Sequence, residues 1–147
     1  MGLSGDLSKM AKLESNLRRL SEVPSQVAAD AAEAIEELIE EEFDAGNDAY
    51  GRAWAPLAPA TLAKGRTPPP LSDTEAMRDS LEVRPMPGAG ISITIDEPAG
   101  IHQTGASRGN WRMPARPILP DRAFPRAWTD AIAEAGERAI TERLGDE

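Results

Sequence analysis

Residues 81–95 read LEVRPMPGAGISITI, and this stretch decides the fold class. On both sides of a turn rich in proline and glycine, apolar side chains alternate with polar ones, at Leu81, Val83, Ile91, Ile93 and Ile95. A period of two is typical of a strand with one buried face, so the stretch predicts a β-hairpin. Helical patterns flank it, which together predicts an α+β protein with a small antiparallel sheet.

Two helices are predicted before the hairpin. Apolar residues at spacings of three and four form one stripe, at Leu7, Met10, Leu13, Leu17 and Leu20. This stripe indicates an amphipathic helix. A second, long helix follows Pro24, with Ser21 or Ser25 as its cap, and ends near Phe43 at the glycine stop Gly46.

The second helix has two sides of different chemistry. One side is mostly apolar, with Val27, Ala31, Ile35, Leu38, Ile39 and Glu42. The other side carries glutamates, at Glu33, Glu36, Glu37, Glu40 and Glu41. Carboxylates near a helix C-terminus oppose the helix dipole and repel one another. We therefore expect the acidic side to serve a partner.

The chain is expected to form one domain, residues 1–147, with four regions. These are an acidic helical region (1–43), a loop rich in proline and glycine (44–70), the hairpin with an arm (71–123), and a C-terminal helix (124–147). In the loop, Trp54 and Leu57 are expected to dock on the core, and residues 58–64 to form a helical turn. A short helix is expected over 73–80, with Asp73 as its cap.

The arm, residues 105–125, is rich in arginine and proline. We expect residues 101–103 to be extended, and another short extended piece around 116–119. Pro125 then starts the last helix, which Gly145 ends. The predicted buried side of that helix comprises Phe124, Trp128, Ile132, Ala135, Ala139, Ile140 and Leu144.

Composition excludes several classes of protein. The chain has no cysteine, which rules out disulfides, thiolate metal sites and a cysteine nucleophile. It has no phosphate-binding glycine loop and no hydrolase or metalloprotease motif. No apolar run approaches the length of a membrane span, and the N-terminus lacks the apolar stretch of a signal peptide. We therefore expect a soluble, non-enzymatic protein made in a cytoplasm, without catalytic residues, cofactor or metal.

His102 and the glutamate cluster are the alternatives to that view. His102 is the single histidine, and a catalytic base would need a carboxylate or nucleophile beside it, which its sequence neighbours do not supply. We expect it to hydrogen-bond locally and to tie the sheet to the arm. Glutamates spaced along a straight helix splay around its axis, so they converge poorly on a cation.

Charge is distributed unevenly along the chain. The net charge is -9, and residues 1–50 hold 4 basic against 12 acidic side chains, a balance of -8. Five arginines lie within residues 101–126, at Arg108, Arg112, Arg116, Arg122 and Arg126. This polarity suits head-to-tail contact between copies, although both regions can also be plain solvated faces. DNA phosphate is a weaker candidate partner for the arginines, because the whole chain is acidic and shows no nucleic-acid-binding motif.

Three segments, in this order, resemble the virion morphogenesis or tail completion family of tailed bacteriophages. The first is GRAWAPL at 51–57 with Thr61 and Lys64 after it. The second is LSDTEAMRDSL at 71–81, in which Glu75 and Met77 stand where the family has glycine and leucine. The third is IHQTG at 101–105, followed by MPARPIL at 113–119. The motif or interface residues that the resemblance identifies are Gly51, Trp54, Pro56, Leu57, Thr61, His102, Gln103, Gly105, Pro114, Arg116 and Pro117.

The resemblance implies a structural virion protein at the head-tail junction. It would act as a ring, expected to be a hexamer, that caps the tail and contacts the tail tube and the neck or connector proteins. DNA would pass through the ring without specific binding, and assembly would take place in the host cytoplasm. The alternative is a scaffolding factor outside the virion that uses the acidic helix. Flanked by Pro114 and Pro117, Arg116 is predicted to be held on a stiff arm that presents its guanidinium to a partner; the alternative is that the prolines only blunt a sheet edge.

Overall fold

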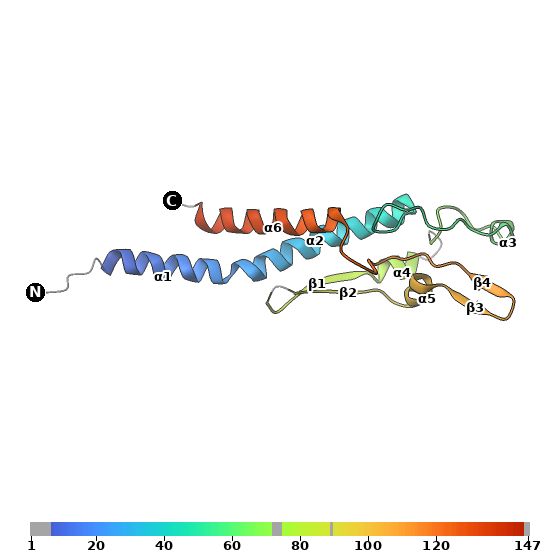
Figure 1. Ribbon diagram of the computed structural model, residues 1–147, viewed down its shortest axis with the longest axis horizontal. Helices are drawn as coiled ribbons and strands as arrows, with labels where there is room; N and C mark the ends of the chain where they lie inside the picture. The colour runs from blue at the N-terminus through green and yellow to red at the C-terminus, as the bar shows by residue number, and fades with distance from the viewer. Residues whose placement is uncertain (1–6, 72–74, 89, 146–147) are drawn as a thin grey trace, which may run out of the picture.

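The computed structural model describes residues 7–71, 75–88 and 90–145, and it shows an elongated α+β protein (Figure 1). The helices are α1 (Leu7–Ser21), α2 (Val23–Ala45), α3 (Pro59–Ala63), α4 (Glu75–Asp79), α5 (Ala99–Thr104) and α6 (Arg126–Leu144). The strands are β1 (Glu82–Met86), β2 (Gly90–Thr94), β3 (Ala106–Arg108) and β4 (Trp111–Met113). The predicted fold class is confirmed. Asp73, the expected cap of the short helix, lies outside the described residues.

The two N-terminal helices follow each other with only Glu22 between them. Pro24 lies in the first turn of α2, where its missing N–H costs no helical hydrogen bond. The expected serine cap is wrong: within the described residues α2 has no side-chain cap, and Ser21 Oγ donates back to the Arg18 carbonyl at 2.6 Å. The predicted stop is confirmed, because Gly46 has φ 70° and donates its N–H to the Glu42 carbonyl at 2.9 Å.

The core lies between α2, α6 and the β1–β2 hairpin. Where α2 packs along α6, small side chains are fully buried and let the two helices approach closely, at Ala28, Ala31, Ala32, Ala135 and Ala139. Larger core residues surround them, namely Ile35, Ile39, Phe43, Trp54, Met77, Leu81, Val83, Ile118 and Trp128. The predicted inward side of α2 is therefore confirmed, including Glu42.

The predicted hairpin is confirmed as antiparallel β1–β2, with Val83 opposite Ile93. Val83 is 8% exposed, and the isoleucines of the partner strand pack partly buried against the core. Within the described residues, the strands make two two-stranded sheets rather than one. The second sheet is the β3–β4 hairpin, closed by a Gly109-Asn110 turn. A two-residue glycine-asparagine turn is a known hairpin signal. This second hairpin was not among the elements predicted from the sequence.

The extended stretch expected at 101–103 is wrong, because these residues belong to α5. The Pro98 carbonyl accepts the N–H groups of Ile101 and His102 at 3.1 Å, and Gly105 closes the helix by donating to the Ile101 carbonyl at 2.8 Å. Three residues are too few for periodicity to distinguish a strand from a helical turn. The segment 116–119 lies outside the strands, and the Gln103 side chain holds it through Ile118 and Leu119. No helix in the described ranges has both the length and the apolar character that a membrane span requires.

Candidate functional site

Trp54 links the loop 44–70 to the arm. Its indole Nε1 donates to the Pro117 carbonyl at 2.7 Å, and its ring is 5% exposed. The ring meets Phe43 edge-on, with centroids 5.7 Å apart. The expected docking of Trp54 on the core is therefore confirmed, and the tryptophan of the first motif makes a contact with the third.

Arg116 makes the reciprocal connection. Its Nε donates to the Ala55 carbonyl at 2.7 Å and its Nη2 to the Pro56 carbonyl at 2.9 Å. The residue is 6% exposed, and burial lowers the pKa of its guanidinium. The prediction that Arg116 is presented to a partner is wrong, because the guanidinium is already bound by its own chain. A buried guanidinium that donates to two carbonyls of its own chain stabilises the fold.

Gln103 anchors the segment that follows Arg116. Its Oε1 accepts the N–H groups of Ile118 and Leu119 at 2.8 and 2.9 Å, and its Nε2 donates to the Leu119 carbonyl at 2.7 Å. One amide side chain therefore satisfies three backbone groups where no strand partner is available. Gln103 therefore ties α5 to the arm through its side chain.

His102 contributes through its backbone. Its carbonyl accepts the Arg116 N–H at 2.7 Å, whereas its Nδ1 is buried without a hydrogen-bond partner among the described residues. Burial, and then the positive charge of Arg116, lower the pKa of the imidazole. The expected local hydrogen bonds of the His102 side chain are not found among the described residues, and the half-buried imidazole lies near Arg116.

Gly105 allows this close packing. Its φ is 72° and its ψ 176°, a backbone conformation that is essentially restricted to glycine. A Cβ at this position would lie 2.8 Å from both the Ala115 nitrogen and the Met113 carbonyl oxygen. We call Trp54, Gln103, Gly105, Arg116 and Pro117 the motif lock.

Gly105→Ala is expected to destabilise the protein by about 2 kcal/mol, because alanine is strained at this φ and its methyl group would displace the arm. Urea unfolding followed by tryptophan fluorescence measures the loss. Gly109→Ala is the control: Gly109 also has a positive φ, of 60°, but its Cβ would meet no atom within 4 Å. Equal losses for the two variants would show that close packing at Gly105 contributes nothing.

The remaining motif residues lie outside the motif lock. Gly51 has φ 80° and open space around it, which fits a turn requirement. Leu57 and Thr61 are half-buried, and Pro56 and Pro114 are exposed. The three motifs thus converge mainly to hold the chain together. They do not form a catalytic arrangement, and no cluster of metal-ligating side chains occurs in the described part of the chain.

α1 and the last turns of α6 lie at the end of the molecule where both termini lie (Figure 1), and both carry exposed apolar side chains. The α1 stripe (Met10, Leu13, Leu17 and Leu20) is between 37% and 65% exposed. Beside it, α6 ends close to the α1–α2 junction, where Arg143 pairs with Glu22. Ile140 and Leu144 are 45% and 42% exposed there, and Phe124 is 57% exposed, so their predicted burial is wrong for a single chain. The predicted burial of Trp128, Ala135 and Ala139 is confirmed, so periodicity identified the apolar side correctly, but the single chain leaves its two ends uncovered.

The acidic face of α2 comprises Glu33, Glu36, Glu37, Glu40, Glu41 and Asp44. Arg78 of α4 neutralises part of it, with Nε 2.6 Å from Glu40 Oε2 and Nη1 2.7 Å from Asp44 Oδ1. Arg78 holds the pKa of the Asp44 carboxyl below its usual range. Sequence reasoning missed this pair, because 34 residues separate the partners and the intervening segment shows no pattern that brings them together.

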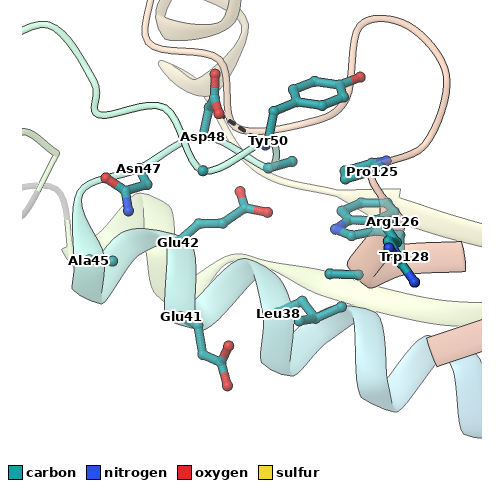
Figure 2. A pocket seen from close by; sticks show the side chains of 13 residues that line it. Leu38, Glu41, Glu42, Ala45, Asn47, Asp48, Tyr50, Pro125, Arg126 and Trp128 are labelled. Atoms are coloured by element: carbon teal, nitrogen blue, oxygen red, sulfur yellow. Dashed lines mark hydrogen bonds between the residues drawn. The ribbon is translucent and has the colours of Figure 1, made fainter. Parts of the chain in front are cut away.

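A pocket of about 490 Å³ lies between the end of α2, the loop 47–51 and the start of α6 (Figure 2). Leu38, Pro125 and Trp128 form apolar parts of its wall, while Asp48 and Glu42 bring carboxylates. Glu42 points into this space, whereas Glu41 points away from it (Figure 2). Glu42 is 8% exposed, and its Oε2 has no hydrogen-bond partner within the described residues.

Electrostatics make Glu42 unusual. Burial, and then the nearby charge of Asp48, raise the pKa of Glu42 to about 8, although a hydrogen bond with the Trp128 side chain acts in the opposite direction. Asp48 lies in a turn, where its Oδ1 accepts the N–H groups of Tyr50 and Arg52 at 2.9 Å. The helical spacing of the apolar residues from 27 to 42 predicted that Glu42 lies on the inward side. No sequence signal revealed the pocket next to it.

A model of the family described as the phage virion morphogenesis family matches residues 6–146 of the chain. The match covers the α1 stripe, the acidic face, the Glu42 pocket and the motif lock. Comparisons with curated proteins and with solved structures gave no match.

Proposed function

Since the chain belongs to the phage virion morphogenesis family, we propose that it is a structural subunit that completes the tail of a phage or of a tail-derived particle. Copies of the chain form a ring, expected to be hexameric, on the head-proximal end of the tail. The ring caps the tail tube and presents a surface to the neck or connector. Its role is geometric rather than catalytic, and it is a component of the finished virion through which DNA passes.

The α1 stripe is the observation that carries this proposal. Four large apolar side chains at helical spacing remain exposed on α1, and Ile140 and Leu144 remain exposed at the same end. Full burial of a side chain of this size contributes roughly 1.5 to 3 kcal/mol. A subunit that leaves such a stripe uncovered gains stability by assembly, as expected for a ring component.

Charge supports a head-to-tail arrangement of the copies. The acidic face lies on α2, whereas exposed arginines lie on the β3–β4 hairpin, so unlike surfaces occur at different places on one chain. Repeated contact between unlike surfaces produces a closed ring when the rotations from one copy to the next add up to a full turn. Exposed ion pairs contribute only about 0 to 1 kcal/mol each, so salt is expected to weaken the ring only modestly.

Leu13→Gln combined with Leu17→Gln tests the proposal. The double variant is expected to lose the ring while its melting temperature stays close to that of the wild type, because both side chains are more than half exposed in the single chain. Mass photometry and negative-stain electron microscopy measure assembly, and phage complementation measures joined, infectious particles.

The control for that experiment is Leu62→Gln combined with Met86→Gln. These side chains are 44% and 51% exposed but lie on α3 and β1 rather than on α1. A wild type that works as a two-fold dimer through identical patches would contradict the ring. Rings that persist in the α1 variant would show that the stripe is not the contact.

The alternative is a scaffolding factor that binds a basic partner through the acidic face and leaves before maturation. Part of that face remains available to a partner, since Arg78 pairs only with Glu40 and Asp44 among its residues. Quantitative mass spectrometry of purified virions separates the two functions. A stoichiometric number of copies supports the ring, and absence from the virion supports the scaffold.

A further inference from the structure

The Glu42 pocket has the properties of a binding site for a hydrogen-bond donor. Its carboxyl is more than nine-tenths buried and aimed into the pocket, yet Oε2 has no hydrogen-bond partner among the described residues (Figure 2). Buried polar atoms are nearly always hydrogen-bonded, and an ionised carboxylate only accepts, so once Glu42 is ionised its unpartnered oxygen lacks a donor. Asp48 supplies a second carboxylate at the same site.

The lining of the pocket defines the chemistry of that donor. The wall contains one cation, Arg126, which lies 3.7 Å from Asp130, so the carboxylates of the wall outnumber its positive charge and call for a further cation. The neighbouring Trp128, Pro125 and Leu38 offer apolar and aromatic surface. A guanidinium fits this combination better than an ammonium, because it is weakly hydrated, donates in a planar fork and stacks on aromatic rings. An aromatic side chain beside the guanidinium would cover the apolar part of the wall.

The β3–β4 hairpin carries such a pair. Arg108 is directly opposite Trp111 in the register, and cross-strand partners lie on the same face of a hairpin. Trp111 is 56% exposed, and Arg108 is exposed without an ion pair to any described residue. Arg112 pairs with Ser107 and therefore lies on the opposite face. Tryptophan and arginine are the residue types that most often dominate interfaces.

We propose that the Glu42 pocket of one copy receives the Arg108–Trp111 face of the β3–β4 hairpin of a neighbouring copy. This contact rests on the proposed ring function and specifies how one subunit recognises the next. The hairpin lies at the end of the molecule remote from the termini, and none of its residues lines the pocket of its own chain (Figure 1). Two unlike surfaces of one chain thus meet head to tail.

The contact resolves the unsatisfied group. The Arg108 guanidinium donates to Glu42 Oε2, and Trp111 covers the apolar wall near Trp128. Pairing with a cation favours the charged carboxylate, so Glu42 releases its proton to solvent as the hairpin docks. Removal of either charged partner then leaves the other one buried and unpaired in the assembled state, which is why each has a large effect on association.

Two matched pairs of variants test the contact. Glu42→Gln and Arg108→Gln are each expected to weaken self-association at least about tenfold, as measured by analytical ultracentrifugation of the full chain. Glu134→Gln, an exposed acid on α6, and Arg112→Gln, on the other face of the hairpin, carry the same charge changes. The self-association constants of these control variants are expected to stay within about threefold of the wild-type value.

The double variant Glu42→Gln with Arg108→Gln distinguishes contact from general charge. If the two side chains meet, the second substitution adds little to the first, whereas independent effects multiply. Multiplying effects, or equal weakening by the two controls, would overturn the contact. Circular dichroism of each variant verifies that the folded state is retained, and the hairpin variants report on the contact even if Glu42→Gln alters the fold.

Cysteine cross-linking provides a second test that does not depend on affinity. The native chain has no cysteine, so Asn110→Cys at the hairpin tip and Arg126→Cys at the pocket rim can be introduced in two chains of different mass. Oxidation of the mixed assembly is expected to give the disulfide between the two different chains. Ser107→Cys, on the opposite hairpin face, is expected to give far less of it with Arg126→Cys.

Failure of the contact can be told apart from failure of the ring. A wild type that forms rings, together with variants that behave like their controls and no preferred cross-link, would overturn the contact and leave the ring standing. A wild type that neither self-associates nor cross-links, alone or in particles, would overturn both.

Discussion

Arg116→Ala is expected to reduce the free energy of unfolding by about 3 kcal/mol, because hydrogen bonds to a charged group contribute roughly 1.5 to 3 kcal/mol each. The guanidinium donates to the carbonyls of Ala55 and Pro56, so its removal also detaches the loop 51–57 from the arm. The measurement is chemical unfolding followed by tryptophan fluorescence, to which Trp54 at the same junction contributes.

Two further variants make this result specific. Arg112→Ala removes an exposed arginine four residues earlier in the arm and is expected to change stability by less than about 0.5 kcal/mol. Arg116→Lys keeps the charge but cannot donate in the same fork, so it should recover only part of the loss. If Arg116→Ala instead folds as stably as the wild type but fails to assemble, the residue belongs to an interface after all.

Periodic patterns predicted the elements that carry long, regular signals. The alternation at residues 81–95 identified β1–β2, and the spacing from 27 to 42 identified the inward side of α2 with Glu42 on it. Both patterns repeat over several residues, so the probability that they arise by chance is small. The family resemblance was likewise confirmed, because its motifs are spread over most of the chain.

Short and long-range features could not be predicted in the same way. One turn of helix at α5 has too few residues for a period, and the proline-flanked Arg116 looked suited to a partner. Its true acceptors are carbonyls about 60 residues away, for which side-chain patterns contain no signal. The exposure of Ile140 and Leu144 shows a different limit: a pattern identifies the apolar side of a helix but not whether the same chain covers it.

The motif lock stabilises the fold, whereas the uncovered surfaces are available for the proposed contacts. Trp54, Gln103 and Arg116 use their polar groups on backbone atoms, which makes the irregular arm rigid without a large sheet. A rigid arm can hold the β3–β4 hairpin in one orientation, and this is what a repeated contact around a ring requires. The family motifs thus act through the fold, while the proposed contacts lie on the α1 stripe, the hairpin and the Glu42 pocket.

Glu42→Gln is expected to abolish most of a pH dependence of stability that the wild type shows in the unassembled state. Glu42 has a folded pKa of about 8, compared with 4.5 for an ordinary glutamate, so the folded chain holds its proton more tightly than the unfolded chain. Below the unfolded pKa both states are protonated and the group has no effect. As pH rises between these two values, unfolding releases a proton and stability falls by about 1.4 kcal/mol per pH unit.

Urea unfolding of dilute wild type and Glu42→Gln at several values between about pH 5 and pH 8 measures this effect. The stability of the wild type relative to the variant is expected to fall by roughly 3 to 4 kcal/mol over that range, which is larger than any other single effect predicted for this chain. Other titrating groups cancel in the comparison, and Glu134→Gln should run parallel to the wild type because Glu134 is exposed. Parallel curves for Glu42→Gln and the wild type would show that Glu42 is ionised in the folded subunit, and that the pocket already satisfies its charge without a partner.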